Sequence, residues 1–129
     1  MNNLGFMYRE GGHGLTQNYV TAVKWFRKGA EAGDDYNQFG LGICYYHGEG
    51  VTKNLVQART WLQKSADQNM KEAQCMLGMM MVQGEGGDRQ MDAGRALWER
   101  AAAAGNKQAQ TNLDKLTTAL RGAGFGIYF

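Results

Sequence analysis

A motif that returns every 36 residues is the feature that most constrains this 129-residue chain. Glycines, short polar residues and alanines fall three times on the same phase, which indicates an array of similar units stacked in a row. The in-phase sets are Gly12, Gly48 and Gly84; Gly14, Gly50 and Gly86; Asn18, Asn54 and Gln90; Ala22, Ala58 and Gly94; Lys28, Lys64 and Arg100; Ala30, Ala66 and Ala102; and Gly33, Asn69 and Gly105.

Each unit has the pattern of a helix, a Gly-x-Gly turn and a second helix. Asn54 is expected to cap the second helix of its unit, because its short side chain can accept hydrogen bonds from the first backbone N–H groups. Asp34 or Asp35 is expected to do the same for a first helix over residues 36–47. Gly33, and Asn69 one period later, are expected to end helices because both residue types tolerate the left-handed conformation.

The second helices carry apolar residues at spacings of three and four, which predicts one buried stripe along each. In the third unit Leu97 and Trp98 replace the earlier aromatic and apolar pair. A weak cap at Gln90 and the nearby glycines predict that this helix starts a residue or two out of phase. The predicted stripes are Ala22, Trp25, Phe26 and Ala30 in the first unit and Ala58, Trp61, Leu62 and Ala66 in the second.

The two ends of the chain depart from the period. The first unit lacks the opening turns of its first helix, so we expect the natural chain to extend upstream. After the third unit a closing helix presents only one apolar stripe, and the last nine residues, RGAGFGIYF, are expected to fold back over it or fray, or else to dock a partner. The predicted divisions are a first repeat (1–33), a second repeat (34–69), a third repeat (70–105), a capping helix (106–120) and a tail (121–129).

The motif L-G-x-x-Y-x-x-G-x-G-V, followed by Asn and A-x-x-W-x-x-K-x-A, resembles the SEL-one-like repeat, a relative of the tetratricopeptide repeat. The resemblance implies an all-α fold: a right-handed α-solenoid of antiparallel helix pairs, with three 36-residue repeats and a C-terminal capping helix. It also implies a non-catalytic adaptor or scaffold that binds proteins or peptides on a concave face lined by first helices. The match is carried by Leu41, Gly42, Tyr45, Gly48, Gly50, Val51, Asn54, Ala58, Trp61, Lys64 and Ala66, and by their in-phase copies.

Composition excludes several classes of partner. Fourteen basic and twelve acidic residues leave a net charge of +2 spread along the chain, which is no footprint for nucleic acid. No apolar run approaches the roughly 20 residues that a membrane span needs. Cellular location stays open: cytoplasmic if Met1 is the true start, and periplasmic or secreted if an upstream signal peptide has been removed. Exposed repeat ends leave self-association possible.

Residues for catalysis or metal binding are sparse. Ser65, the only serine, lacks a lysine three residues on, the pattern of a serine acyl-transfer site. Cys44 and Cys75 are expected to be reduced core residues. His13 and His47 flank glycine turns without further ligands nearby. We therefore predict a non-enzyme with no metal and no cofactor.

First-helix positions that the repeat leaves unspecified are unusually apolar here. They are candidates for a surface that holds an apolar or helical peptide, while the alternative is that they pack within the stack. Two functions follow: an adaptor with a peptide groove, or an immunity protein that neutralises a secreted bacterial toxic enzyme over a broad interface. The predicted partner-binding residues are Arg9, Phe39, Ile43, Tyr46, Met79 and Val82.

Overall fold

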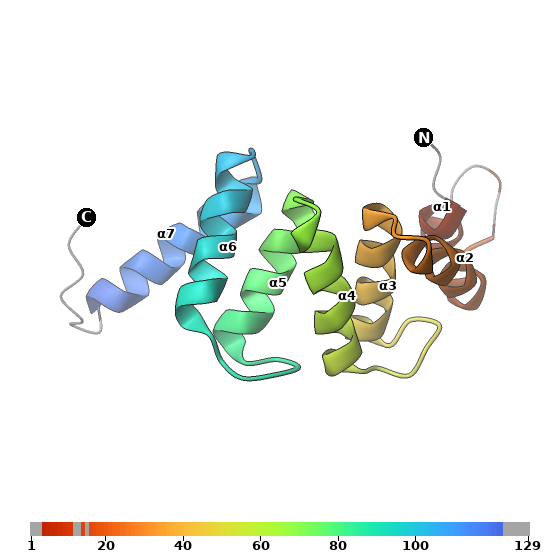
Figure 1. Cartoon of the computed structure of the whole chain (residues 1–129), viewed down its shortest axis with the longest axis horizontal. Helices are drawn as coiled ribbons and strands as arrows, with labels where there is room; N and C mark the ends of the chain where they lie inside the picture. Colours follow the sequence, from red (N-terminus) through yellow and green to blue (C-terminus); the bar gives the residue numbers. More distant parts are fainter. Residues whose placement is uncertain (1–3, 12–13, 15, 123–129) are drawn as a thin grey trace.

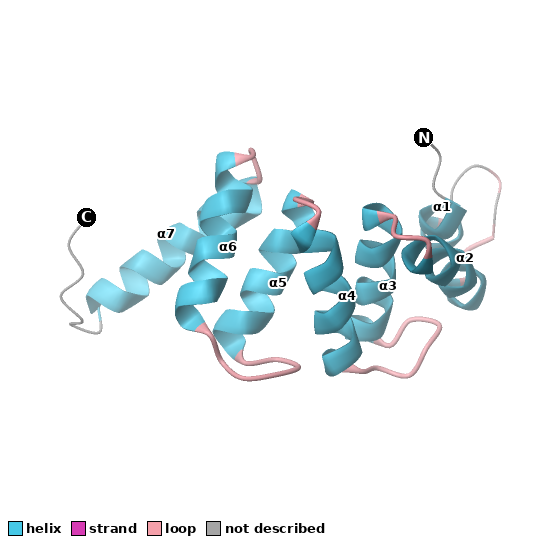
Figure 2. Cartoon of the chain, viewed as in Figure 1, coloured by secondary structure: helices cyan, strands magenta, loops and turns pink. Residues whose placement is uncertain are grey.

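The computed structural model describes residues 4–11, 14 and 16–122. These residues form helices joined by turns, with no strand among them, and the helices follow one another along an extended row (Figures 1 and 2). The helices are α1 (Leu4–Glu10), α2 (Tyr19–Glu31), α3 (Asp35–His47), α4 (Leu55–Asp67), α5 (Lys71–Gln83), α6 (Met91–Ala103) and α7 (Lys107–Gly122).

The helix bounds repeat with the period of the sequence. The second helices α2, α4 and α6 start 36 residues apart, and so do α3, α5 and α7. Each helix packs mainly against its neighbours in the chain, and α1 also contacts α3. The all-helical solenoid of helix pairs is therefore confirmed, and the handedness of its superhelix stays a prediction.

The caps confirm most of the predicted helix starts. The side chains of Asn18 and Asn54 accept hydrogen bonds from the backbone N–H groups of Thr21 and Gln57, each at 3.0 Å. Asp34 caps α3 in the same way. These bonds satisfy donors that the first helical turn leaves without a partner.

The predicted shift at the start of α6 is wrong. Gln90 makes no capping bond through its side chain, yet α6 begins at Met91, in phase with α4. A backbone contact supplies the reason: Gln90 N–H donates to the Met81 carbonyl at 2.8 Å, as Asn54 N–H does to the Tyr45 carbonyl. The preceding first helix thus fixes where the second helix starts, even where the cap is weak.

The turns depend on left-handed residues at the predicted places. Gly48 and Gly50 have φ values of +73° and +74°, and Gly84 and Gly86 repeat them at +72° and +73°. Asn69 has φ of +66° and is the one described non-glycine residue with positive φ. Asparagine therefore takes the helix-ending role that glycine has elsewhere in the array.

The apolar core is spread along the row in three clusters. The first joins α2 and α3, the second joins α4, α5 and Leu97 of α6, and the third joins α5, α6 and Ala109 of α7. Close helix approach depends on glycines: a Cβ added at Gly42 or Gly78 would come within 3.0 Å of Leu62 or Trp98. Each unit is consequently stabilised by its neighbours.

The predicted burial of Trp25 is wrong. Its side chain is 38% exposed, whereas Phe26 beside it is 0% exposed. One period later Trp61 is half-buried, because it packs against the cluster formed by α2 of the preceding unit and α3 of its own unit. No described element precedes α1 and α2 to cover Trp25 in that way, and Lys28 Nζ lies 5.6 Å from the centre of its ring instead. The stripe of α2 is completed by Val23, which is 5% exposed.

Candidate functional site

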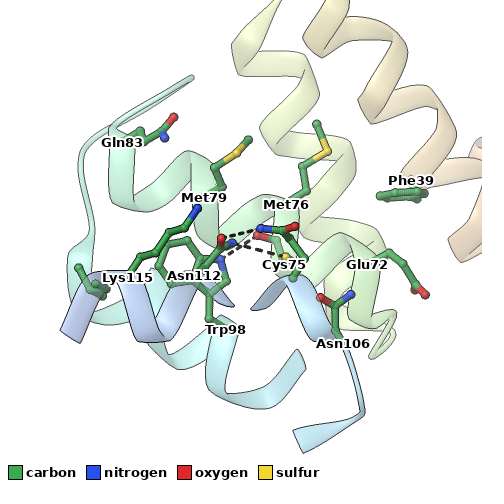
Figure 3. A pocket seen from close by; sticks show the side chains of 12 residues that line it. Phe39, Glu72, Cys75, Met76, Met79, Gln83, Trp98, Asn106, Asn112 and Lys115 are labelled. Carbon is green, nitrogen blue, oxygen red and sulfur yellow. Dashed lines mark hydrogen bonds between the residues drawn. The ribbon is translucent and has the colours of Figure 1, made fainter. Parts of the chain in front are cut away.

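An open groove of about 720 Å³ lies between α5 and α7. Phe39 of α3 lies at one side of it and Lys115 of α7 at the other (Figure 3). Trp98 of α6 also lines it. The groove is therefore built mainly by first helices, on the side that the repeat motif predicts to be concave. Its lining consists of Phe39, Glu72, Cys75, Met76, Met79, Gln83, Trp98, Asn106, Gln108, Asn112, Lys115 and Leu116.

The groove has an apolar floor and a polar rim. Met76, Met79 and Leu116 are half-buried and pack against the core clusters beneath them. Gln83 and Lys115 are exposed on opposite walls. Flexible methionine side chains adapt to differently shaped apolar groups, and amide and ammonium groups at a rim can pair with a bound backbone. This arrangement suits a ligand with apolar side chains on one face.

A hydrogen-bonded cluster holds α5, α6 and α7 together at the base of the groove (Figure 3). Trp98 Nε1–H donates to the Cys75 carbonyl at 2.9 Å. The Asn112 amide nitrogen lies 3.8 Å from Cys75 Sγ, and Gln108 Nε2–H donates to Asn112 Oδ1 at 2.9 Å. The contacts of Cys75 thus join α5 to α6 and to α7 at the base of the groove.

The structure distributes the six predicted binding residues over different environments. All six are half-buried. Phe39 and Met79 line the groove, whereas the other four do not. Val82 packs against the cluster of Cys75 and Trp98. Ile43 lies on α3, one period before Met79.

Arg9 and Tyr46 contact the turn of the following unit. Arg9 Nε donates to Glu49 at 3.1 Å, and the Tyr46 hydroxyl donates to Glu85 at 2.9 Å. Burial, reinforced by this hydrogen bond and the charge of Glu85, raises the pKa of Tyr46. Glu49 and Glu85 are 36 residues apart, so the two contacts are equivalent and join neighbouring units.

The wall supplied by α7 was missed by the sequence interpretation, which treated this helix only as a cap. The period contains the signal. Adding 36 to Met76 and Met79 gives Asn112 and Lys115, and adding 36 to Glu72 gives Gln108. Extending the unspecified positions of Met79 and Met80 by one more period reaches Lys115 and Leu116 of this wall.

The serine and the described histidine, which could in principle act in catalysis, do not lie next to each other in the structure. The Ser65 side chain is 0% exposed, and its hydroxyl donates to the Asp35 carbonyl at 2.9 Å. His47 is exposed at the end of α3, and His13 lies outside the described residues. Among the residues that the structure describes, no three His, Cys, Asp or Glu side chains gather as a metal site would require. None of the described helices is long and apolar enough to cross a membrane.

Both cysteines are buried and unpaired, as predicted. Burial, with a contribution from Glu49, raises the pKa of Cys44 from 9.0 to about 11. Burial and Glu72 also raise the pKa of Cys75. A raised pKa keeps a thiol protonated, which is opposite to the activation that a nucleophilic cysteine requires.

We expect iodoacetamide at pH 8 to alkylate Cys75 before Cys44 in the folded chain, with both rates rising sharply in urea. Cys75 is 8% exposed beside the groove, whereas Cys44 is 0% exposed. The pKa of Cys44 is higher in the folded chain than in the unfolded chain, so burial of the protonated thiol supports folding fully below pH 9. This contribution to the free energy of unfolding is lost as pH rises through about 11. Mass spectrometry of labelled peptides measures the rates; equal rates in the folded and unfolded chain would contradict the burial of both thiols.

Comparison with known proteins places these features in context. A family model described as Sel1 repeat matches residues 1–34, 38–70 and 71–106. No curated protein matches the chain in sequence. Among solved structures, a Sel1 repeat protein from Oxalobacter formigenes is 34% identical with a TM-score of 0.79, over 85% of this chain and 45% of its own.

Two further structures are similar. A protective antigen of uropathogenic Escherichia coli strains, displaying an SLR fold, is 30% identical with a TM-score of 0.84, over 92% of this chain and 25% of its own. Cysteine rich protein B of Helicobacter pylori, 22% identical with a TM-score of 0.73 over 86% of this chain and 85% of its own, shares the fold. The chain spans less than half the length of the first two proteins.

Proposed function

The chain belongs to the Sel1 repeat family, and from this premise we propose that it is a scaffold that binds a segment of a partner protein in the groove between α5 and α7. Sel1 repeat proteins generally serve as non-catalytic scaffolds for protein–protein interaction. The observation that carries the proposal is the groove itself, with its apolar floor, amide-rich rim and hydrogen-bonded base.

The size and chemistry of the groove favour a peptide segment. Its volume of about 720 Å³ lies within the usual range of ligand pockets in proteins. The rim carries Glu72 and Lys115, one charge of each sign, so neither a strongly acidic nor a strongly basic ligand is favoured. A segment anchored by apolar side chains and paired with the rim amides fits both features.

The groove residues argue against catalysis as the main role. Cys75 is the one cysteine of the lining, and burial raises its pKa. The lining contains no histidine or serine, so no base and nucleophile meet there in the manner of an acyl-transfer site. Binding is what this set of side chains performs best.

The proposal is tested by capture of a partner from host lysate with matched variants. Gln83→Glu with Lys115→Glu alters both walls of the groove at exposed positions, so the fold should be retained. Gln57→Glu with Lys53→Glu makes the same chemical changes at exposed positions away from it. Met79→Gln keeps the length of a floor side chain and makes it polar.

We expect the parent and the control variant, Gln57→Glu with Lys53→Glu, to capture the same amount of one partner. The two groove variants should each capture at least tenfold less of that partner. Circular dichroism confirms that each variant is folded. Retention that is equal in all four proteins would refute the groove as the site. It would favour the broad interface of an inhibitor, whose affinity is spread over a larger surface.

A further inference from the structure

The residues that follow α7 have the pattern of a ligand for this groove. Residues 123–129, AGFGIYF, lie outside the described residues. Phe125, Ile127 and Phe129 occupy alternate positions. In an extended chain alternate side chains point to one face, so these three would form an apolar edge. Gly124 and Gly126 would allow the backbone to approach a surface closely.

The length of this apolar edge matches the groove. From Phe125 to Phe129 an extended chain covers about 13 Å. The groove wall on α7 runs from Gln108 to Leu116, which is about 12 Å of helix. The wall on α5, from Glu72 to Gln83, is about 16 Å long. Three apolar side chains spaced at about 7 Å therefore fit along the floor.

The attachment point allows the segment to reach the groove. Helix α7 ends at Gly122, and Leu116 of the groove lies six residues earlier, about 9 Å along the same helix. Ala123 and Gly124 provide a short reversal, and seven extended residues reach at most about 25 Å. The segment can therefore return along α7 antiparallel to it.

We propose that the groove binds an extended segment with large apolar side chains at every second residue, and that residues 123–129 of the same chain occupy it in this way. This inference rests on the proposed function, because it takes the groove as the binding site. A short tether gives an effective concentration near millimolar. If the tail binds the groove with a dissociation constant of about 0.1 mM, molecules with a filled groove would outnumber those with an empty one by about ten to one. A partner protein would then have to displace the tail.

The test uses the full chain and a variant of its tail, Phe125→Ser with Ile127→Ser and Phe129→Ser. Alkylation of Cys75, which lines the groove, reports occupancy, and Cys44 is the internal control away from it. We expect Cys75 to react about tenfold faster in the tail variant and Cys44 to react equally in both. Equal Cys75 rates would overturn the proposal.

A fluorescent peptide of residues 121–129 provides the second measurement. We expect it to bind the tail variant at least tenfold more tightly than the parent, and to lose binding when Met79→Gln is added. A peptide of the same composition in which the two phenylalanines and the isoleucine are placed next to one another is the control for alternation, and should bind weakly.

The remaining outcomes separate this inference from the proposed function. Equal binding of the peptide to parent and tail variant shows that the tail does not fill the groove, and no binding to either shows that the groove does not take this segment; both overturn the inference. Protection of Cys75 that rises with protein concentration indicates a second copy's tail and also overturns it. The partner-capture experiment is independent of all these results and alone decides the proposed function.

Discussion

Replacing Phe26 with alanine is expected to destabilise the folded chain by about 3–5 kcal/mol, the cost of removing a fully buried aromatic ring and leaving a cavity. Phe26 is 0% exposed and lies between two first helices. A Cβ added at Gly5 or at Gly40 would come within 3.0 Å of its ring, so α1 and α3 approach the ring from both sides. Because α1 and α3 already contact the ring through the backbone at glycines, they cannot move readily into the cavity that its removal would leave.

Trp25→Ala is the matched control for this prediction. Trp25 is the adjacent residue on the same helix, but its side chain is 38% exposed. Its removal takes less apolar area out of a packed environment, and we expect a cost of about 1–2 kcal/mol. Urea denaturation followed by circular dichroism compares the two midpoints. Equal shifts would show that the two residues are buried to the same extent, contrary to the structure.

Gly86→Ala is expected to destabilise the chain by about 2–5 kcal/mol, through two costs that combine. Gly86 has φ of +73°, where an L-residue costs about 1–2 kcal/mol. Its new Cβ would also come within 3.0 Å of the Leu55 carbonyl oxygen. That oxygen belongs to the backbone of α4 and cannot rotate away, so the turn must move off the preceding unit at a further cost of about 1–3 kcal/mol.

Gly14→Ala separates these two costs. Gly14 is the in-phase copy of Gly86 and has a similar φ of +77°, but nothing lies within 4 Å of an added Cβ. Only the left-handed conformation is penalised there, so we expect about 1–2 kcal/mol. The same urea measurement applies. If both substitutions shift the midpoint equally, the overlap of the added Cβ with the α4 backbone carries no extra cost, contrary to this prediction.

Helix starts and turns could be predicted from the sequence because their causes are local and periodic. Asn54 caps its helix with its own side chain, and Asn69 ends one by adopting a positive φ. Neither depends on residues far away in the chain. The period then carried the same assignments to each unit, which explains why the bounds of the helices were close to the observed ones.

The candidate groove could be predicted only in part. Phe39 and Met79 were found because unspecified positions of a first helix were unusually apolar. Lys115 and Asn112 were not predicted as lining residues, because polar residues on a closing helix do not by themselves indicate a binding surface. Their place in the groove lining follows from the stacking of α7 beside α5, which places residues 36 positions apart around one space.

The sequence by itself determined the repeat, its helix pairs, their caps and their glycine turns, because these depend on residues within one unit and recur in the next. The tertiary structure decided which apolar side chains are covered. Trp25 and Trp61 share a phase, yet only Trp61 has a described preceding unit to pack against. It also decided the start of α6 and the walls of the groove, since both depend on contacts between helices and not on the residues of one helix.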